Sequence, residues 1–266
     1  MDSTILIIAL LIVGLVGLVL AILINVLSNF LYVKVDEKEA AIRECLPGNN
    51  CGACGFSGCD GYAAAIAHDG APINSCPVGG PAVADAIGEI TGASAGDSVK
   101  MVAFVKCSGN VNNATDKYIY SGTKSCVQAM SVPGSGSKLC ENACLGLGSC
   151  VSVCDFDAIR VCNGVAVVDK DACVACGKCA KTCPKHIIDM VPYAAPIRVA
   201  CANTSKGKAV MEACKVGCIG CMLCTKQCEF DAIHVENNIA IIDYEKCTKC
   251  GKCAEKCPRK IITINN

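Results

Sequence analysis

The sequence predicts an α+β protein in which an apolar N-terminal helix precedes cysteine-rich units of short helices and β-hairpins. Three observations predict this fold class. Residues 4–33 carry no charged side chain, the 26 cysteines include two runs that repeat each other, and both repeats contain a tight-turn signal between apolar segments. Aromatic residues make up only 4% of the chain and Trp is absent. We therefore expect bound metal to supply much of the folding free energy.

The apolar N-terminal segment predicts a single transmembrane helix. Its length exceeds the roughly 20 residues that cross a hydrocarbon core. A cleaved signal peptide is the alternative, but only Asp2 is charged before the segment and no small-residue cleavage site follows it. Because Lys34, Lys38 and Arg43 come directly afterwards, we expect a single-pass protein of the cell (inner) membrane with its C-terminal bulk on the cytoplasmic side.

The repeated cysteine runs predict iron–sulfur clusters. The later repeat has the spacing C-x2-C-x2-C-x3-C from Cys218 to Cys228, and the same run recurs from Cys247 to Cys257. In bacterial two-cluster ferredoxins, three close thiolates and one thiolate from the other run hold each cubane. A disulfide scaffold is disfavoured, because three thiols so close together cannot each find a partner nearby.

Exchange of the fourth ligand between runs predicts two cluster sites in each of two ferredoxin-like units. The C-terminal unit would use Cys218, Cys221, Cys224, Cys257 for one site and Cys228, Cys247, Cys250, Cys253 for the other. The central unit would use Cys154, Cys173, Cys176, Cys179 and, at a second site, Cys140, Cys144, Cys150, Cys183. The last set departs from the standard spacing, because residues 145–149 widen its loop.

A glycine-rich segment before these units predicts a fifth cluster. The segment Leu-Pro-Gly-Asn-Asn-Cys-Gly-Ala-Cys-Gly opens a C-x2-C-x4-C-x16-C pattern made by Cys51, Cys54, Cys59, Cys76. Its glycines allow backbone amides to approach cluster sulfurs closely. A zinc site is the alternative, although zinc sites usually pair two cysteine knuckles. Cys45 and Cys162 fall outside every pattern and are interpreted as non-ligands.

Four remaining cysteines admit two interpretations. The segments ending at Cys107 and Cys201 both predict a short strand placed before a ferredoxin-like unit, and Cys126 and Cys214 follow them. These four thiols could bind a sixth cubane, or they could be buried thiols without a metal.

The expected domain boundaries follow from these motifs. They are 1–33 for the membrane anchor, 34–100 for the first cluster module, 101–139 for a connecting segment, 140–190 for ferredoxin-like unit 1, 191–217 for a second connecting segment and 218–266 for ferredoxin-like unit 2.

No catalytic residue is expected, because neither a dinucleotide-binding fingerprint nor a phosphate-binding loop occurs. Nucleic-acid binding is not expected either, since no basic stripe is interleaved with aromatic residues.

An apolar helix, the glycine-rich cysteine module and paired ferredoxin-like units in this order resemble the B-subunit family of the Rnf complex. That complex is a membrane ferredoxin:NAD oxidoreductase that pumps sodium ions or protons. The resemblance covers essentially the whole chain and implies the longer, clostridial type. It implies a subunit with no substrate chemistry beyond electron transfer. The cysteine sets themselves predict five [4Fe-4S] clusters, with a sixth possible, and the apolar segment predicts contact with membrane lipid.

The resemblance also implies the partners. They are reduced ferredoxin and the other membrane and NAD-binding subunits of the complex. From the order of the modules along the chain, we expect ferredoxin to dock on a ferredoxin-like unit and electrons to pass towards the Cys51 module. Two other functions remain open from the sequence. They are an electron-transfer subunit of a membrane hydrogenase or formate dehydrogenase, and a zinc-stabilised membrane interaction module.

Overall fold

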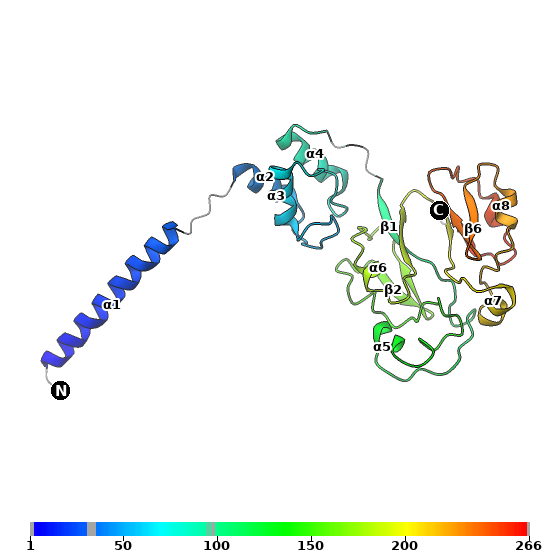
Figure 1. The fold of residues 1–266 in the computed structure, drawn as a ribbon, viewed down its shortest axis with the longest axis horizontal. Coiled ribbons are helices and arrows are strands. Elements are labelled where there is room, and N and C mark those ends of the chain that lie inside the picture. Colours follow the sequence, from blue (N-terminus) through cyan, green and yellow to red (C-terminus); the bar gives the residue numbers. More distant parts are fainter. Residues whose placement is uncertain (1–2, 31–35, 95, 97–98, 265–266) are drawn as a thin grey trace.

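The computed structural model describes residues 3–30, 36–94, 96 and 99–264 (Figure 1). Helix α1 (Ser3–Phe30) coincides with the apolar N-terminal segment. Its side chains are described from residue 11 to residue 27, and all of these are exposed. Within the described residues no helix is both long enough and apolar enough to cross a membrane, so the predicted transmembrane helix is not confirmed. Residues 1–2 and 31–33 of the predicted anchor lie outside the described residues.

Three helices form the first module around a small core. They are α2 (Glu37–Cys45), α3 (Cys59–Asp69) and α4 (Gly80–Thr91). Side chains from all three helices, Ile42, Tyr62 and Ile87, are almost fully buried. Asp36 caps α2 by accepting a hydrogen bond from the amide of Lys38. The helices therefore hold the glycine-rich cysteine segment, which has no regular structure of its own.

The central unit consists of β1 (Met101–Val105), α5 (Cys126–Met130), β2 (Ile159–Cys162), β3 (Val165–Val168), α6 (Lys178–Thr182) and β4 (Ile188–Pro192). β2 and β3 form the predicted hairpin, with Ile159 opposite Val168. Asn163 and Gly164 both have positive φ at its turn, which confirms the tight turn expected there. β1 pairs antiparallel with β4, so part of the predicted connecting segment 101–139 is a strand of this unit.

The C-terminal unit repeats this arrangement. It consists of β5 (Ile197–Val199), α7 (Gly207–Ala213), α8 (Leu223–Gln227), β6 (Ile233–Glu236), β7 (Ile239–Ile242), α9 (Lys252–Glu255) and β8 (Ile262–Ile264). β6 and β7 form a hairpin whose turn, Asn237 and Asn238, also has positive φ. β5 pairs with β8, as β1 does with β4. The repeat in sequence is thus a repeat in structure.

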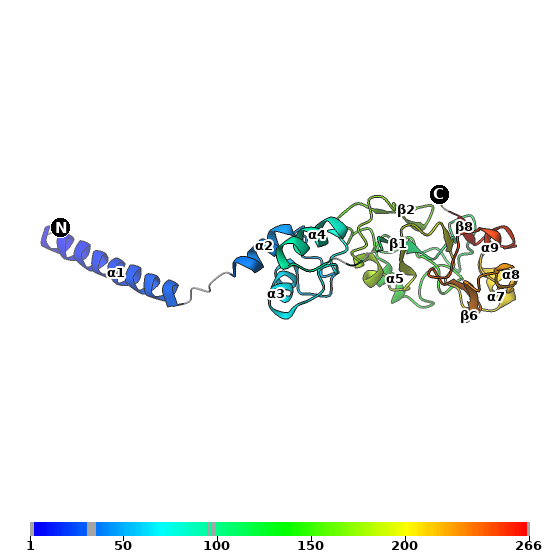
Figure 2. The ribbon, with the colours of Figure 1, turned by 90° about the horizontal axis from the view of Figure 1, so that it is seen from above.

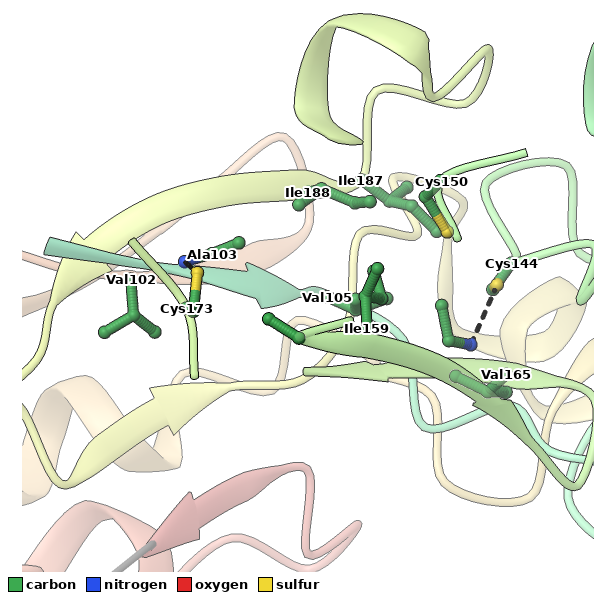
Figure 3. Packing of buried hydrophobic residues seen from close by; sticks show 12 residues of the cluster. Val102, Ala103, Val105, Cys144, Cys150, Ile159, Val165, Cys173, Ile187 and Ile188 are labelled. Atoms are coloured by element: carbon green, nitrogen blue, oxygen red, sulfur yellow. Dashed lines mark hydrogen bonds between the residues drawn. The ribbon is translucent and has the colours of Figure 1, made fainter. Parts of the chain in front are cut away.

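Each unit has its own hydrophobic core, and cysteines form part of all three cores. In the central core, Cys144, Cys150 and Cys173 lie among Val105, Ile159 and other aliphatic side chains (Figure 3). Figures 1 and 2 agree that the first module, the central unit and the C-terminal unit follow one another along the molecule. Candidate metal ligands are therefore distributed along its length.

Candidate functional site

Two predicted cysteine sets each surround a cavity at corresponding places in the two ferredoxin-like units. One cavity of about 360 Å3 is lined by Cys154, Cys173, Cys176 and Cys179. The other, of about 340 Å3, is lined by Cys228, Cys247, Cys250 and Cys253. The structure thus brings together the cysteines of both predicted sets, including the remote fourth member of each.

The other set of the C-terminal unit lies around helix α8. Cys224 is buried, and its neighbours include Cys218 and Cys221. Cys257 packs against the same core, which contains Cys218 and Cys224. These contacts agree with the predicted grouping of these four cysteines.

The second set of the central unit differs from the prediction. Its cavity of about 350 Å3 is lined by Cys126, Cys144, Cys150 and Cys183, and Cys140 is not among its lining residues. The amide of Cys126 donates to the hydroxyl of buried Ser149, at 2.8 Å, which holds the start of α5 beside Cys150. In this cavity Cys126 thus takes the place that the spacing assigned to Cys140.

Comparison of the two repeats explains why Cys126, and not Cys140, lines this cavity. The spacing Cys144-x5-Cys150 equals Cys218-x5-Cys224, but Leu147 stands where the C-terminal unit has Cys221. The central unit therefore lacks the middle cysteine of its run, and Cys126 supplies a fourth thiol from a distant part of the chain. An alignment through Cys144 and Cys218 was the sequence signal that could have revealed the gap.

In the first module, two side chains position the cysteine segment. Asn50 accepts a hydrogen bond from the amide of Cys59 at 2.8 Å, which ties the Cys51 loop to the start of α3. The Tyr62 hydroxyl donates to the carbonyl of Pro72 at 2.6 Å and accepts from the amide of Ser75 at 3.0 Å. The loop before Cys76 is thereby fixed against α3.

The thiols of this module lie near one another. Burial raises the pKa of Cys76, the amides of Gly79 and Val78 lower it, and the nearby Cys54 and Cys59 raise it further. Cys51 lies close enough to Cys176 of the central unit to raise the pKa of that thiol. The candidate sites of the first module and the central unit are therefore neighbours.

Backbone amides point at several of these sulfurs. Ala103 of β1 donates to Cys173, and Ala166 of β3 donates to Cys144, both at 3.4 Å (Figure 3). Ala232 donates to Cys228 at 3.4 Å. Such hydrogen bonds stabilise negative charge on a ligating sulfur and raise the reduction potential of a cluster bound to it.

The buried thiols favour their neutral form. Burial, together with the charges of Cys144, Cys126 and Cys183, raises the pKa of Cys150 to about 12. Burial likewise raises the pKa of Cys179 and of Cys253 to about 11. Four thiolates in one such cavity require positive charge to compensate them, which the iron of a cluster provides. The donor set thus fits a cationic group bound by thiolates.

A further cavity lies between the two ferredoxin-like units. Cys107, Cys140, Cys201 and Cys214 line it, and its volume is about 340 Å3. Three of these belong to the sixth set expected from the sequence. Cys126, the fourth expected member, lines the second cavity of the central unit instead, and Cys140 lies at this cavity in its place.

The two cysteines interpreted as non-ligands, and His234, do not line these cavities. Cys45 packs against the core of the first module, and Cys162 ends strand β2. His234 lies 2.9 Å from the carbonyl oxygen of Asp231. In the described part of the chain, no group of three or more His, Cys, Asp or Glu side chains could hold a metal ion; the cysteines surround cavities instead.

Comparison with protein families matches three segments of the chain. Residues 46–78 match a putative Fe-S cluster family, residues 166–189 a 4Fe-4S binding domain, and residues 217–262 a 4Fe-4S dicluster domain. These segments include the cysteine pattern of the first module and both runs of the C-terminal unit. They also include the second run of the central unit, whereas Cys107, Cys126, Cys140, Cys201 and Cys214 lie outside them.

Curated relatives extend the similarity to nearly the whole chain. The chain is 44% identical over 252 residues, 95% of its length and 76% of the relative, to the B subunit of a Na(+)-translocating ferredoxin:NAD(+) oxidoreductase complex from Acetobacterium woodii. The chain belongs to the Rnf B-subunit family. The B subunit of an ion-translocating oxidoreductase complex from Methanosarcina acetivorans is 39% identical over 93% of the chain. The B subunit of a proton-translocating ferredoxin:NAD(+) oxidoreductase complex from Clostridium ljungdahlii is 38% identical over 94%.

Membership of the Rnf B-subunit family confirms the resemblance seen in the motifs. The relatives from A. woodii and M. acetivorans are covered over 76% and 94% of their own lengths, so the similarity includes both ferredoxin-like units. The similarity to these two relatives thus extends over the first module and both ferredoxin-like units.

Proposed function

We propose that this chain is the iron–sulfur electron-transfer subunit of a membrane ferredoxin:NAD oxidoreductase coupled to Na+ or H+ translocation. The observation that carries the proposal is the set of similar cavities in the two ferredoxin-like units, each lined by four cysteines. Membership of the Rnf B-subunit family supports the kind of complex. When bound at such a site, a [4Fe-4S] cluster accepts and releases an electron, with no substrate chemistry by the protein.

We assign five ligand sets on this basis. They are Cys51, Cys54, Cys59, Cys76; Cys126, Cys144, Cys150, Cys183; Cys154, Cys173, Cys176, Cys179; Cys218, Cys221, Cys224, Cys257; and Cys228, Cys247, Cys250, Cys253. The protein supplies burial, which excludes water, and amide hydrogen bonds to the sulfurs. Both contributions adjust the potential of a bound cluster without a catalytic side chain.

Two ion pairs occupy equivalent places beside these sites. Lys178 contacts Asp155 at 2.5 Å in the central unit, and Lys252 contacts Glu229 at 2.5 Å in the C-terminal unit. Each acidic residue directly follows a proposed ligand, Cys154 or Cys228. The pairing keeps carboxylate charge compensated near a site that becomes more negative on reduction.

The order of the sites along the molecule suggests the direction of electron flow. Cys51 lies near Cys176 and Lys178, so the first module adjoins the central unit. The first module also directly follows α1 in the chain. Reduced ferredoxin would therefore dock on a ferredoxin-like unit, and the membrane and NAD-binding subunits would receive electrons from the first module.

Helix α1 is proposed as a single-pass anchor in membrane lipid. Most of its described side chains are apolar, and all are exposed, for example Leu11 at 68% and Val13 at 70%. Such a surface is stable in a hydrocarbon environment. Lys38 and Arg43 follow the helix and support a cytoplasmic location for the cluster units. This location is also where soluble ferredoxin would meet them.

Anaerobic purification of the full-length chain tests the proposal. Iron and acid-labile sulfide in equal amounts, a broad visible absorption and an EPR signal after reduction by ferredoxin are expected. Zinc without sulfide, or a folded protein that ferredoxin does not reduce, would refute it. Co-purification with a hydrogenase or formate dehydrogenase, instead of flavoprotein and nucleotide-binding subunits, would refute the assignment to this complex.

A further inference from the structure

The cavity between the two ferredoxin-like units has the attributes of the cluster sites within them. The space inside it, about 340 Å3 including its opening to solvent, is the same as at the cavity lined by Cys228 and its partners. Two of its cysteines, Cys107 and Cys140, come from the central half, and two, Cys201 and Cys214, from the C-terminal half. The cavity therefore matches the other sites both in size and in its number of thiols.

These four cysteines occupy equivalent places in the two repeats. The spacing Cys140-x3-Cys144 equals Cys214-x3-Cys218, and the runs continue in register from there. Cys107 stands two residues after β1, as Cys201 stands two residues after β5. Cys107 and Cys140 of the central half are thus equivalent to Cys201 and Cys214 of the C-terminal half. All four line one cavity, so its cysteines are arranged with approximate two-fold symmetry.

The hydrogen bonds at the cavity obey the same symmetry. Cys107 accepts from the amides of Cys144 and Gly109, both at 3.4 Å. Cys201 accepts from the amides of Cys218, at 3.4 Å, and Asn203, at 3.5 Å. Each sulfur therefore receives two amide donors, one of them from a cysteine proposed to bind a neighbouring cluster.

The surroundings of the cavity suit an anionic group. The buried ammonium of Lys138 donates to the carbonyl oxygens of Gly109 and Gly164, at 2.6 and 2.9 Å. The Arg259 guanidinium donates to the carbonyl oxygen of Cys214 at 2.7 Å. A Cβ at Gly109 would lie 3.4 Å from the Cys107 sulfur. The backbone at Gly109 therefore packs directly against this thiol.

We propose that Cys107, Cys140, Cys201 and Cys214 hold a sixth [4Fe-4S] cluster, which joins the two ferredoxin-like units. The inference rests on the proposed function of the other five sites. Transfer of a preformed cluster from a thiol carrier forms four S–Fe bonds here and breaks four S–Fe bonds to the carrier. The four thiol protons released here protonate the carrier's freed thiolates, so there is no net oxidation.

The location of the site gives it a role between the units. Cys144 and Cys218, whose amides contact Cys107 and Cys201, belong to the proposed sets on either side. The chain also crosses the junction next to the cavity, where Thr115 and Lys215 form backbone hydrogen bonds with Ala213 and Asn113. A cluster here connects the sites of the two units and cross-links their folds.

Iron counting on the full-length, anaerobically reconstituted chain tests the proposal. The wild type is expected to bind about 24 iron atoms with equal sulfide, and a Cys140→Ala/Cys214→Ala double variant about 20, at four per cubane. A Cys162→Ala control is expected to keep the wild-type content. Adding Cys126→Ala to the double variant should remove about four more, because Cys126 belongs to a different site.

Each outcome decides between the possibilities. A fully loaded wild type with about 20 iron atoms overturns the sixth cluster and leaves the proposed function intact. A triple variant with the same content as the double variant overturns the separation of Cys126 from Cys140. If the double variant does not fold, the wild-type count still decides, since about 24 and about 20 are distinct on the four-iron count per cubane. A folded wild type that binds no iron refutes the proposed function itself.

Discussion

Tyr62→Phe isolates the contribution of one hydroxyl to the loop that carries Cys76. The ring is 1% exposed and lies 5.0 Å from the ring of Phe56, and phenylalanine keeps both the volume and this contact. The variant loses the hydrogen bonds to the carbonyl of Pro72 and the amide of Ser75. The effect is therefore one of hydrogen bonding, with no cavity created.

The magnitude follows from what becomes of the two partners. The carbonyl of Pro72 keeps a second donor, the Ser75 hydroxyl at 3.2 Å, whereas the amide of Ser75 loses the partner described for it. An unsatisfied donor costs about 1–3 kcal/mol, and the lower half of this range applies because Ser75 is only half-buried. We expect the free energy of local opening to fall by about 1–2 kcal/mol.

Hydrogen exchange of the cluster-loaded chain measures this change locally. Peptides that cover residues 72–79 should exchange about 5- to 30-fold faster in the variant, the factor that corresponds to 1–2 kcal/mol. Tyr118→Phe is a matched control, because that hydroxyl also donates to a proline carbonyl, of Pro133, but at 3.4 Å and with exposure to solvent. Exchange within twofold of the wild type at residues 72–79 would refute this account of Tyr62.

Three further predictions concern electron transfer, the anchor and the glycine-rich turns. Cys54→Ala should leave ferredoxin able to bleach the visible absorption of the other sites, while NADH formation by the assembled complex stops; unimpaired turnover would contradict the proposed order of sites. Deletion of residues 1–33 should give a brown protein that remains soluble without detergent and is still reduced by ferredoxin; failure to load iron would show that α1 has a role in folding. Gly146→Ala should lower iron content by about four atoms, because φ is +69° and its Cβ would lie 2.5 Å from the carbonyl oxygen of Gly164. Gly177→Ala has a similar φ of +76° but open space around it, so equal iron loss in both variants would show that the clash is irrelevant.

Local sequence was sufficient for the elements that depend on short-range interactions. The hairpin turns at Asn163 and Asn237 were predictable, because positive φ is permitted there by the residue types themselves. The cysteine sets with regular spacing were predictable for a related reason. A run such as C-x2-C-x2-C brings three thiols close together within a few residues. The remote fourth cysteine stands at the same sequence separation from the run in both units.

Other features depended on contacts between distant segments. Strands β1 and β5 lie in regions expected to be connecting segments, since a three- to five-residue apolar run does not reveal its pairing partner. The same holds for Cys126, which reaches the second central cavity from 18 residues before the run at Cys144. Both Cys126 and Cys140 precede the run that begins at Cys144, and the loops that join them to it can have any length. Cysteine spacing alone therefore cannot show which of the two completes the site.

The amino-acid sequence by itself determined three features of this protein: cysteines in repeated runs, an apolar N-terminal helix and membership of the Rnf B-subunit family. The tertiary structure decided which thiols share a cavity and how the units adjoin. Cys140 and Cys214 are 74 residues apart, yet they line one cavity because the two repeats pack with equivalent positions facing each other. Local spacing is a property of a short segment, whereas the grouping of ligands across two units requires the packing of the whole chain.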